Sequence, residues 1–179
     1  VPHIIRENRY YAYGPYVKEM NLWFKYVDTV LLVAPIQEGT VSAIDLPYQH
    51  SKIDFRMVPA FSLLSVKEIV KTIIHLPRIV RATYIAMRDA DHIHLRCPGN
   101  MGLVACLLQM LFPKKNKTAK YAGNWDPKSK QPWSYRLQKW ILSNTWLTRN
   151  MKVLVYGEWE NASSNIVPFF TATYHDSDK

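Results

Sequence analysis

Short apolar runs alternate with longer segments of helical periodicity along this chain of 179 residues. The short runs are rich in β-branched residues or alternate apolar with polar residues, and several end at proline or glycine, as β-strands do. The predicted strands cover residues 29–34, 52–58, 92–95, 118–122 and 152–156, and the predicted helices cover 16–27, 65–87, 100–112 and 132–147. Strands that alternate with helices in this way favour a parallel sheet with crossover helices. We therefore predict an α/β fold, a Rossmann-like parallel sheet sandwiched by helices, in a single domain over residues 1–179.

Two of the predicted helices carry further expectations. Ser65 and Glu68 form a capping box at the start of one, and Pro77 within it predicts a kink or two abutting helices. The other helix, at 132–147, has an aromatic face that either packs as a core or forms an interfacial belt at a membrane. That face comprises Trp133, Leu137, Trp140, Ile141 and Trp146. Residues 36–50 are expected to form a hairpin or an excursion, and the tail from residue 161 a loop.

The positive charge of the chain is concentrated in one segment. The chain carries 23 Lys and Arg against 14 Asp and Glu, which gives a net charge of +9. Residues 114–152 include many of the basic residues but only one acid, Asp126, whereas basic and acidic residues balance in the rest of the chain. Such a segment indicates either an anionic partner (a membrane surface, a nucleic acid or a phosphorylated substrate) or a solvated basic face.

Several classes of protein have no support in the sequence. The glycine-rich dinucleotide fingerprint, the P-loop and the nucleophile elbow of α/β-hydrolases are all missing. No apolar run is long enough for a transmembrane helix, and residues 1–6 lack the layout of a signal peptide. Two cysteines are too few for a disulfide framework, so we expect a reducing, cytoplasmic compartment. His92 and His94 share one face of a strand, but no third ligand is evident, and we expect no metal.

The loops at the ends of the strands are where an open parallel sheet binds ligands. Arg96, Gly99 and Asn100 connect the 92–95 strand to the helix that follows it. The first turn of that helix presents backbone N–H groups and the positive end of the helix dipole, which favour an anion or sugar hydroxyls. Arg96 adds donors suited to phosphate or carboxylate. Alternatively, Gly99 only permits the turn and Asn100 only caps the helix.

Two other segments are candidates for substrate binding. Asn124 and Trp125 follow the 118–122 strand, where a ring face suits the CH groups of a sugar and an amide suits its hydroxyls. The alternative is that Trp125 closes the core. Tyr13 and Gly14 belong to a segment with four tyrosines, residues 8–16, which we expect to be a recognition loop because each tyrosine hydroxyl needs a partner.

The order of these motifs along the chain resembles that of a known protein family. The segments are the tyrosine-rich 8–16, Asp28–Pro35, Arg88–Arg96, Lys120–Trp125 and Val153–Gly157. Together they resemble the N-terminal domain of a GT-B type glycosyltransferase of family 4. That family often shows Asp-x-x-His-x-His at the strand here placed at 92–95. Asp91 and His94 match, but Arg96 replaces the second histidine and Trp125 stands where histidine is common, so no residue is assigned as catalytic.

The resemblance implies the acceptor-binding half of a retaining, metal-independent hexosyltransferase that uses a nucleotide-sugar donor. The substrate-binding residues are then Tyr13, Gly14, His94, Arg96, Gly99, Asn100, Asn124 and Trp125. A separate C-terminal domain binds the donor in that family, and the usual first strand and its glycine-rich loop would precede Val1, so we expect this portion alone to be inactive. The acceptor would be a glycan or a lipid-linked sugar of surface polysaccharide or glycolipid synthesis.

The basic segment then points to the inner face of the cytoplasmic membrane, and no nucleic acid is expected as a partner. The alternative is a non-catalytic Rossmann-like binding module whose residues 114–152 engage a membrane or a nucleic acid.

Overall fold

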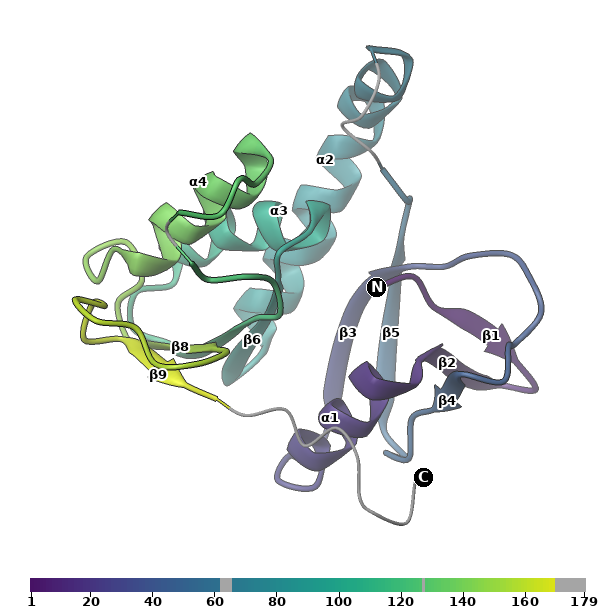
Figure 1. The fold of residues 1–179 in the computed structure, drawn as a ribbon. Coiled ribbons are helices and arrows are strands. Elements are labelled where there is room, and N and C mark those ends of the chain that lie inside the picture. The colour runs from purple at the N-terminus through teal and green to yellow at the C-terminus, as the bar shows by residue number, and fades with distance from the viewer. Residues whose placement is uncertain (62–65, 127, 170–179) are drawn as a thin grey trace. The chain divides into compact units, whose positions relative to one another are not determined.

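The computed structural model describes residues 1–61, 66–126 and 128–169. They belong to two compact units, the first within residues 1–82 and the second within residues 83–171 (Figure 1). Helix α2 (Val66–Asp89) begins in the first unit and ends in the second. The single domain expected over residues 1–179 stays a prediction. Ser65 of the predicted capping box lies outside the described residues.

The first unit combines a parallel pair of strands with a small antiparallel sheet. β3 (Val30–Pro35) and β5 (Ile53–Val58) pair in parallel, at the two apolar runs predicted to be strands. The antiparallel sheet has the order β1-β2-β4 and consists of β1 (Ile4–Arg6), β2 (Arg9–Tyr13) and β4 (Asp45–Pro47). Helix α1 (Gly14–Phe24) follows β2 directly. Its buried Tyr16, Val17 and Met20 pack with Ala12 and Tyr48 to form the core of this unit.

The tyrosine-rich segment at residues 8–16 is not the loop that we expected. It contains β2, the second strand of a β-hairpin that β1 begins, and the start of α1. Glu7 and Asn8 form the two-residue turn, both at positive φ (49° and 59°), as a type I′ turn requires. The prediction was wrong because aromatic residues favour strands, and the run Arg9–Tyr13 is one.

Helix α2 runs through Pro77 as one helix of 24 residues, not as two abutting helices. A proline removes one backbone hydrogen bond and crowds the carbonyl four residues before it. The hydrogen bonds on either side of that position are untouched, and in so long a helix they continue in both directions.

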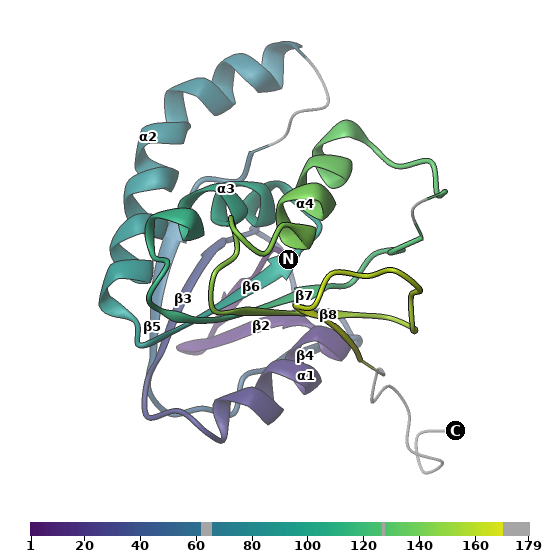
Figure 2. The same ribbon diagram turned by 90° about the vertical axis from the view of Figure 1, so that its left-hand side faces the viewer.

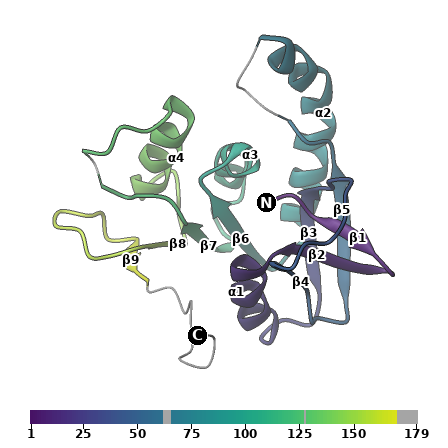
Figure 3. The same cartoon turned by 45° about the vertical axis from the view of Figure 1, so that its right-hand side comes forward.

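The second unit is built on a four-stranded sheet in which all strands are parallel, and this confirms the parallel α/β expectation for this part of the chain. The strands are β6 (His92–Cys97), β7 (Asn116–Tyr121), β8 (Met151–Val155) and β9 (Ile166–Pro168), adjacent in that order (Figure 3). Strand β9 lies where we expected only a loop, because three residues are too few to show a period. Helix α3 (Asn100–Leu108) and the 3₁₀ turn η1 (Gln109–Leu111) connect β6 to β7, and α4 (Trp133–Ser143) connects β7 to β8.

The two faces of this sheet differ in character. Both α3 and α4 cover one face (Figure 2), and the side chains there are apolar. They include Ile93, Leu95, Ala119, Val153 and Val155, which pack with Cys106, Ile141 and Leu142. Because side chains alternate along a strand, the intervening residues lie on the opposite face. The strand register places His92, His94, Arg96, Asn116, Thr118, Lys120 and Lys152 on that face. Leu154 also lies on this second face, and Lys117 lies on the first, so the sheet has one mainly apolar side and one mainly polar, basic side.

Helix α4 buries only part of the face that we predicted. Its buried residues are Gln138, Ile141 and Leu142, with Leu137 partly buried against the core. Trp133 and Trp140 are 63% and 60% exposed, and Trp146, which follows the helix, is 69% exposed. Of the two alternatives for this face, packing as a core is therefore wrong for the three tryptophans. The buried side of the helix is turned toward Gln138 and Leu142 and includes Ile141 but not the tryptophans.

Candidate functional site

The candidate site lies at the carboxyl edge of the parallel sheet, where β6 turns into α3. Arg96 is the penultimate residue of β6, and the chain then passes through a cis Cys97–Pro98 peptide and Gly99 to Asn100, the first residue of α3. Gly99 is the N-cap residue of α3 and provides no side-chain cap. Only two residues separate the end of β6 at Cys97 from the first turn of α3. This places a guanidinium, a helix amino terminus and a carboxamide within a few residues of one strand end.

Gly102 allows α3 to approach the strand this closely. A Cβ atom at that position would lie 2.8 Å from the backbone oxygen of Arg96 and 2.8 Å from Oε1 of Gln138. Real Cβ contacts are never this short, so the first turn of α3 packs directly on the end of β6 only because residue 102 has no side chain. No local sequence pattern indicates this role of Gly102, since a glycine in a helical segment does not reveal which residues pack against it.

Gln138 of α4 fixes this turn from the side. Its Oε1 accepts a hydrogen bond from the Gly99 N–H at 3.3 Å, and its amide nitrogen donates to the Ser134 carbonyl at 3.1 Å. The side chain is completely buried. A buried polar group without a partner costs free energy, and both ends of this amide have one. Gln138 thus couples α4 to the β6–α3 turn, a contact between distant residues that no local pattern predicts.

His94 and His92 share a single hydroxyl on the polar face of the sheet. Nδ1 of His94 lies 2.8 Å, and Nε2 of His92 lies 2.9 Å, from Oγ1 of Thr118. Burial lowers the pKa of His94 to about 3, helped by the charges of His92, Arg96 and Lys120, and burial also lowers the pKa of His92. His94 is therefore neutral at pH 7 and serves as a hydrogen-bonding group rather than a cation.

Asn124 and Trp125 lie beyond the carboxyl end of β7 and are placed very differently. Asn124 is exposed, and its Oδ1 accepts a hydrogen bond from the Asp126 N–H at 2.8 Å. Trp125 is only 6% exposed and belongs to the core, with its ring edge-to-face with Tyr121 at 5.0 Å. The Nζ atom of Lys139 lies 5.5 Å from its ring centroid. This placement favours the alternative in which Trp125 closes the core, because no open ring face remains for a sugar.

Tyr13 and Gly14 lie in the first unit, at the junction of β2 and α1. Tyr13 is half exposed, at 51%. The Gly14 N–H donates to the Ile44 carbonyl at 2.9 Å, and a Cβ atom at Gly14 would lie 2.5 Å from that same oxygen. Glycine is thus required here for the close approach of two backbone segments, a structural role that the sequence alone did not reveal.

The basic segment at residues 114–152 is only partly a surface. Lys117 and Lys120 are buried, and Lys115 and Lys139 are half buried. Three of these lysines donate to backbone carbonyls: Lys115 to Arg88 and Ala90, Lys117 to Gln109 and Phe112, and Lys139 to Trp125 and Asp126. Lys120 instead lies over the rings of Phe169 and Tyr156, at 4.2 and 5.1 Å. These cations stabilise the fold, so neither a uniformly solvated face nor a uniform anion-binding face describes the segment.

Comparison with protein-family models, with curated proteins and with solved structures finds no match. Among the described residues, no three His, Cys, Asp or Glu side chains are grouped as metal ligands would be. Within the same residues, no helix has both the length and the apolar character needed to cross a bilayer.

Proposed function

We propose that this chain is the acceptor-binding half of a GT-B type glycosyltransferase resembling family 4. It would transfer a sugar from a nucleotide-sugar to a glycan or lipid-linked acceptor in surface polysaccharide or glycolipid synthesis. The observation that supports this proposal is the position of Arg96, at the carboxyl end of a parallel strand and directly before the amino terminus of α3. Open parallel sheets bind their ligands at this edge.

The chemistry of this edge suits an acceptor that carries hydroxyls and a phosphate. The guanidinium of Arg96, on the sheet face opposite α3, suits the oxygens of a phosphate, and the first turn of α3 at the same sheet edge adds backbone N–H groups and the positive end of a helix dipole. The carboxamides of Asn100 and Asn124 donate to and accept from sugar hydroxyls. His94, neutral and hydrogen-bonded to Thr118, supports the strand beside Arg96.

The reaction also needs a domain that binds the nucleotide-sugar. We propose that a second Rossmann domain supplies it, and that residues 1–179 alone bind an acceptor without turning it over. No resident cofactor or metal is part of the proposal, and no residue of this chain is assigned to the chemical step.

The experiment is a sugar-transfer assay on the gene product that carries this chain together with a donor-binding domain. We expect Arg96→Ala to lower kcat/KM by about tenfold or more, since a lost charged hydrogen bond costs about 1.5–3 kcal/mol. Arg96→Lys should recover only part of the activity, because ammonium lacks the paired donors. Arg6→Ala, an exposed arginine in β1, is the matched control. Unchanged transfer by a folded Arg96→Ala enzyme would contradict the assignment.

A second proposal concerns a peripheral contact with an anionic membrane on its cytoplasmic side, and the exposed tryptophans of α4 favour it. Arg136 follows Trp133 by three residues and precedes Trp140 by four, so the three side chains share a helix face. The guanidinium of Arg149 lies 5.5 Å from the ring of the exposed Trp146. Tryptophan prefers the headgroup region of a bilayer, and each basic residue near an anionic surface adds about 1 kcal/mol.

Vesicle sedimentation tests this contact. We expect the chain to bind phosphatidylglycerol-containing vesicles and not pure phosphatidylcholine, and Trp133→Ala with Trp140→Ala to weaken binding about tenfold or more. Tyr26→Ala, which removes an exposed aromatic residue of the first unit, should have no effect. Equal binding by the double variant would contradict the role of α4. A steeply salt-dependent affinity for duplex DNA, with none for vesicles, would support the nucleic-acid alternative instead.

A further inference from the structure

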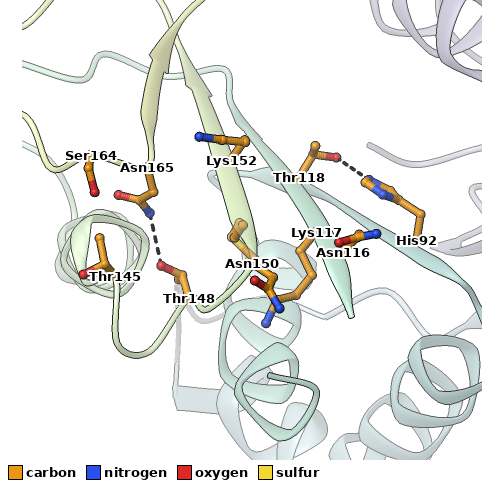
Figure 4. A pocket seen from close by; sticks show the side chains of 11 residues that line it. His92, Asn116, Lys117, Thr118, Thr145, Thr148, Asn150, Lys152, Ser164 and Asn165 are labelled. Carbon is orange, nitrogen blue, oxygen red and sulfur yellow. Dashed lines mark hydrogen bonds between the residues drawn. The ribbon is translucent and has the colours of Figure 1, made fainter. Parts of the chain in front are cut away.

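A polar hollow lies at the amino edge of the four-stranded sheet, the edge opposite the β6–α3 turn (Figure 4). His92, Asn116 and Met151, the first residues of β6, β7 and β8, line it together with Asn165, which directly precedes β9. Its volume is about 640 Å³, and it is open to solvent. The elements that form it all belong to the second unit.

We propose that this hollow binds the phosphate group of a small ligand, with Lys152 as the anchoring cation. Ten of its eleven lining residues are polar, and none of the eleven is a carboxylate. The ionised oxygens of a phosphate accept hydrogen bonds and carry negative charge, so they are met by ammonium and by hydrogen-bond donors such as hydroxyl and amide groups. A lining that offers ammonium, hydroxyl, amide and imidazole groups without a carboxylate therefore favours an oxyanion.

Lys152 differs from the lysines that the fold uses internally. It is exposed, and among the residues that the structure describes its ammonium has no hydrogen-bond or ion-pair partner. The ammonium of Lys117, in the same lining, is by contrast fully engaged by Gln109 and by the Phe112 carbonyl. Lys152 thus leaves one uncommitted positive charge in the hollow.

Hydroxyl groups line the hollow on both sides of Lys152. Lys152 is paired in register with Thr118 on β7, whose hydroxyl points toward His92 in Figure 4. The Lys152 side chain extends the other way, toward Ser164 and Asn165, so the hydroxyl of Ser164 is the one on the side of the ammonium. A hydroxyl has one hydrogen and two lone pairs. When His92 and His94 both donate to Oγ1 of Thr118, the hydroxyl hydrogen remains for a ligand.

A titration followed by amide NMR tests the proposal, with inorganic phosphate and glycerol 3-phosphate as probes at constant ionic strength. We expect saturable shifts at residues 92, 118, 152 and 164. Lys152→Met should weaken the affinity by about tenfold, the loss of one charged hydrogen bond, and Ser164→Ala by less. Lys114→Met, an exposed lysine outside the hollow, is the matched control and should bind as the unaltered chain does.

The two probes separate the possible sources of the phosphate. Tighter binding of glycerol 3-phosphate assigns the hollow to phosphate monoesters, and equal binding assigns it to the free anion. Shifts that do not saturate, or that spread over the exposed lysines alike, would overturn the proposal. Unchanged affinity in a folded Lys152→Met variant would do so too.

Discussion

The ammonium of Lys117 lies 2.8 Å from Oε1 of Gln109, and both side chains are buried. The same Nζ also donates to the carbonyls of Gln109 and Phe112, at 3.2 and 3.1 Å. An ammonium has three hydrogens, so its donors are all used, and they satisfy carbonyls at the end of the α3–η1 segment. A cation at the carboxyl end of a helix also interacts favourably with the helix dipole.

We predict that Lys117→Met lowers the free energy of unfolding by about 2–4 kcal/mol, because it leaves several buried acceptors without a donor. Chemical denaturation followed by circular dichroism measures the loss. The matched control is Lys114→Met, which removes an exposed lysine and should change stability by less than about 0.5 kcal/mol. Equal stability of the two variants would show that the carbonyls find other donors.

A second prediction concerns the pH dependence of stability through His3. This residue is buried, its Nε2 lies 2.7 Å from the Tyr48 hydroxyl, and burial lowers its pKa to about 4. Between pH 6.5 and about 4 the unfolded chain binds a proton at this imidazole that the folded chain does not. Stability therefore falls as the pH is lowered through this range, by up to about 1.4 kcal/mol per pH unit.

Unfolding free energies of the unaltered chain and of His3→Gln, compared from pH 7 to pH 4, test this linkage. The variant lacks the titrating group, so its curve should be flatter, while the contribution of His94 persists in both proteins. Parallel curves would assign the acid sensitivity to other groups. His75→Gln is the control, since His75 is exposed.

A third prediction follows from the contact of Gly102 with the end of β6. Replacing a helical glycine by alanine normally stabilises a protein by about 0.5–1 kcal/mol. Here the new Cβ would meet the Arg96 carbonyl and Gln138 at 2.8 Å, so we expect Gly102→Ala to destabilise by about 1–3 kcal/mol. The thermal unfolding temperature of Gly102→Ala should be lower than that of the unaltered chain, and that of Gly102→Val should be lower still. A more stable Gly102→Ala protein would mean that α3 can move away from the strand.

A fourth prediction concerns the two thiols. Cys97 and Cys106 are buried, with their Sγ atoms 3.6 Å apart, and the hydrogen bond from Cys97, with burial, raises the pKa of Cys106. A thiol reagent attacks an exposed thiolate, so neither residue should react in the folded protein. A disulfide-exchange reagent should detect both thiols only after denaturation, whereas a Ser143→Cys variant, with an exposed position, should react at once. Rapid labelling of Cys97 or Cys106 would reveal local opening of the β6–α3 turn.

Strands and helices were predicted correctly where the apolar pattern of a segment matches its burial in the folded protein. The strands at 92–97 and 151–155 are continuous apolar or alternating runs, and α3 is almost wholly apolar, so any fold that buries them must place them in a core. The β1–β2 hairpin was missed because its tyrosines suggested a surface, and β9 because it has only three residues. The position of Arg96 at a strand end was predicted, whereas the packing of Gly102 against that strand end and the hydrogen bond from Gly99 to Gln138 were not.

The sequence by itself determined the alternation of strands and helices and the location of the β6–α3 turn, and from the alternation it predicted a parallel sheet. These depend on interactions between residues close in the chain, namely periodicity and turn-forming residues. Only the tertiary structure decided which lysines are internal, which flank of α4 is buried and that Trp125 lies in the core. The sequence around a lysine does not show whether its ammonium is hydrated or donates to the carbonyls of a distant helix. The hydrogen-bond partner of the ammonium depends on packing between segments that lie far apart in the chain.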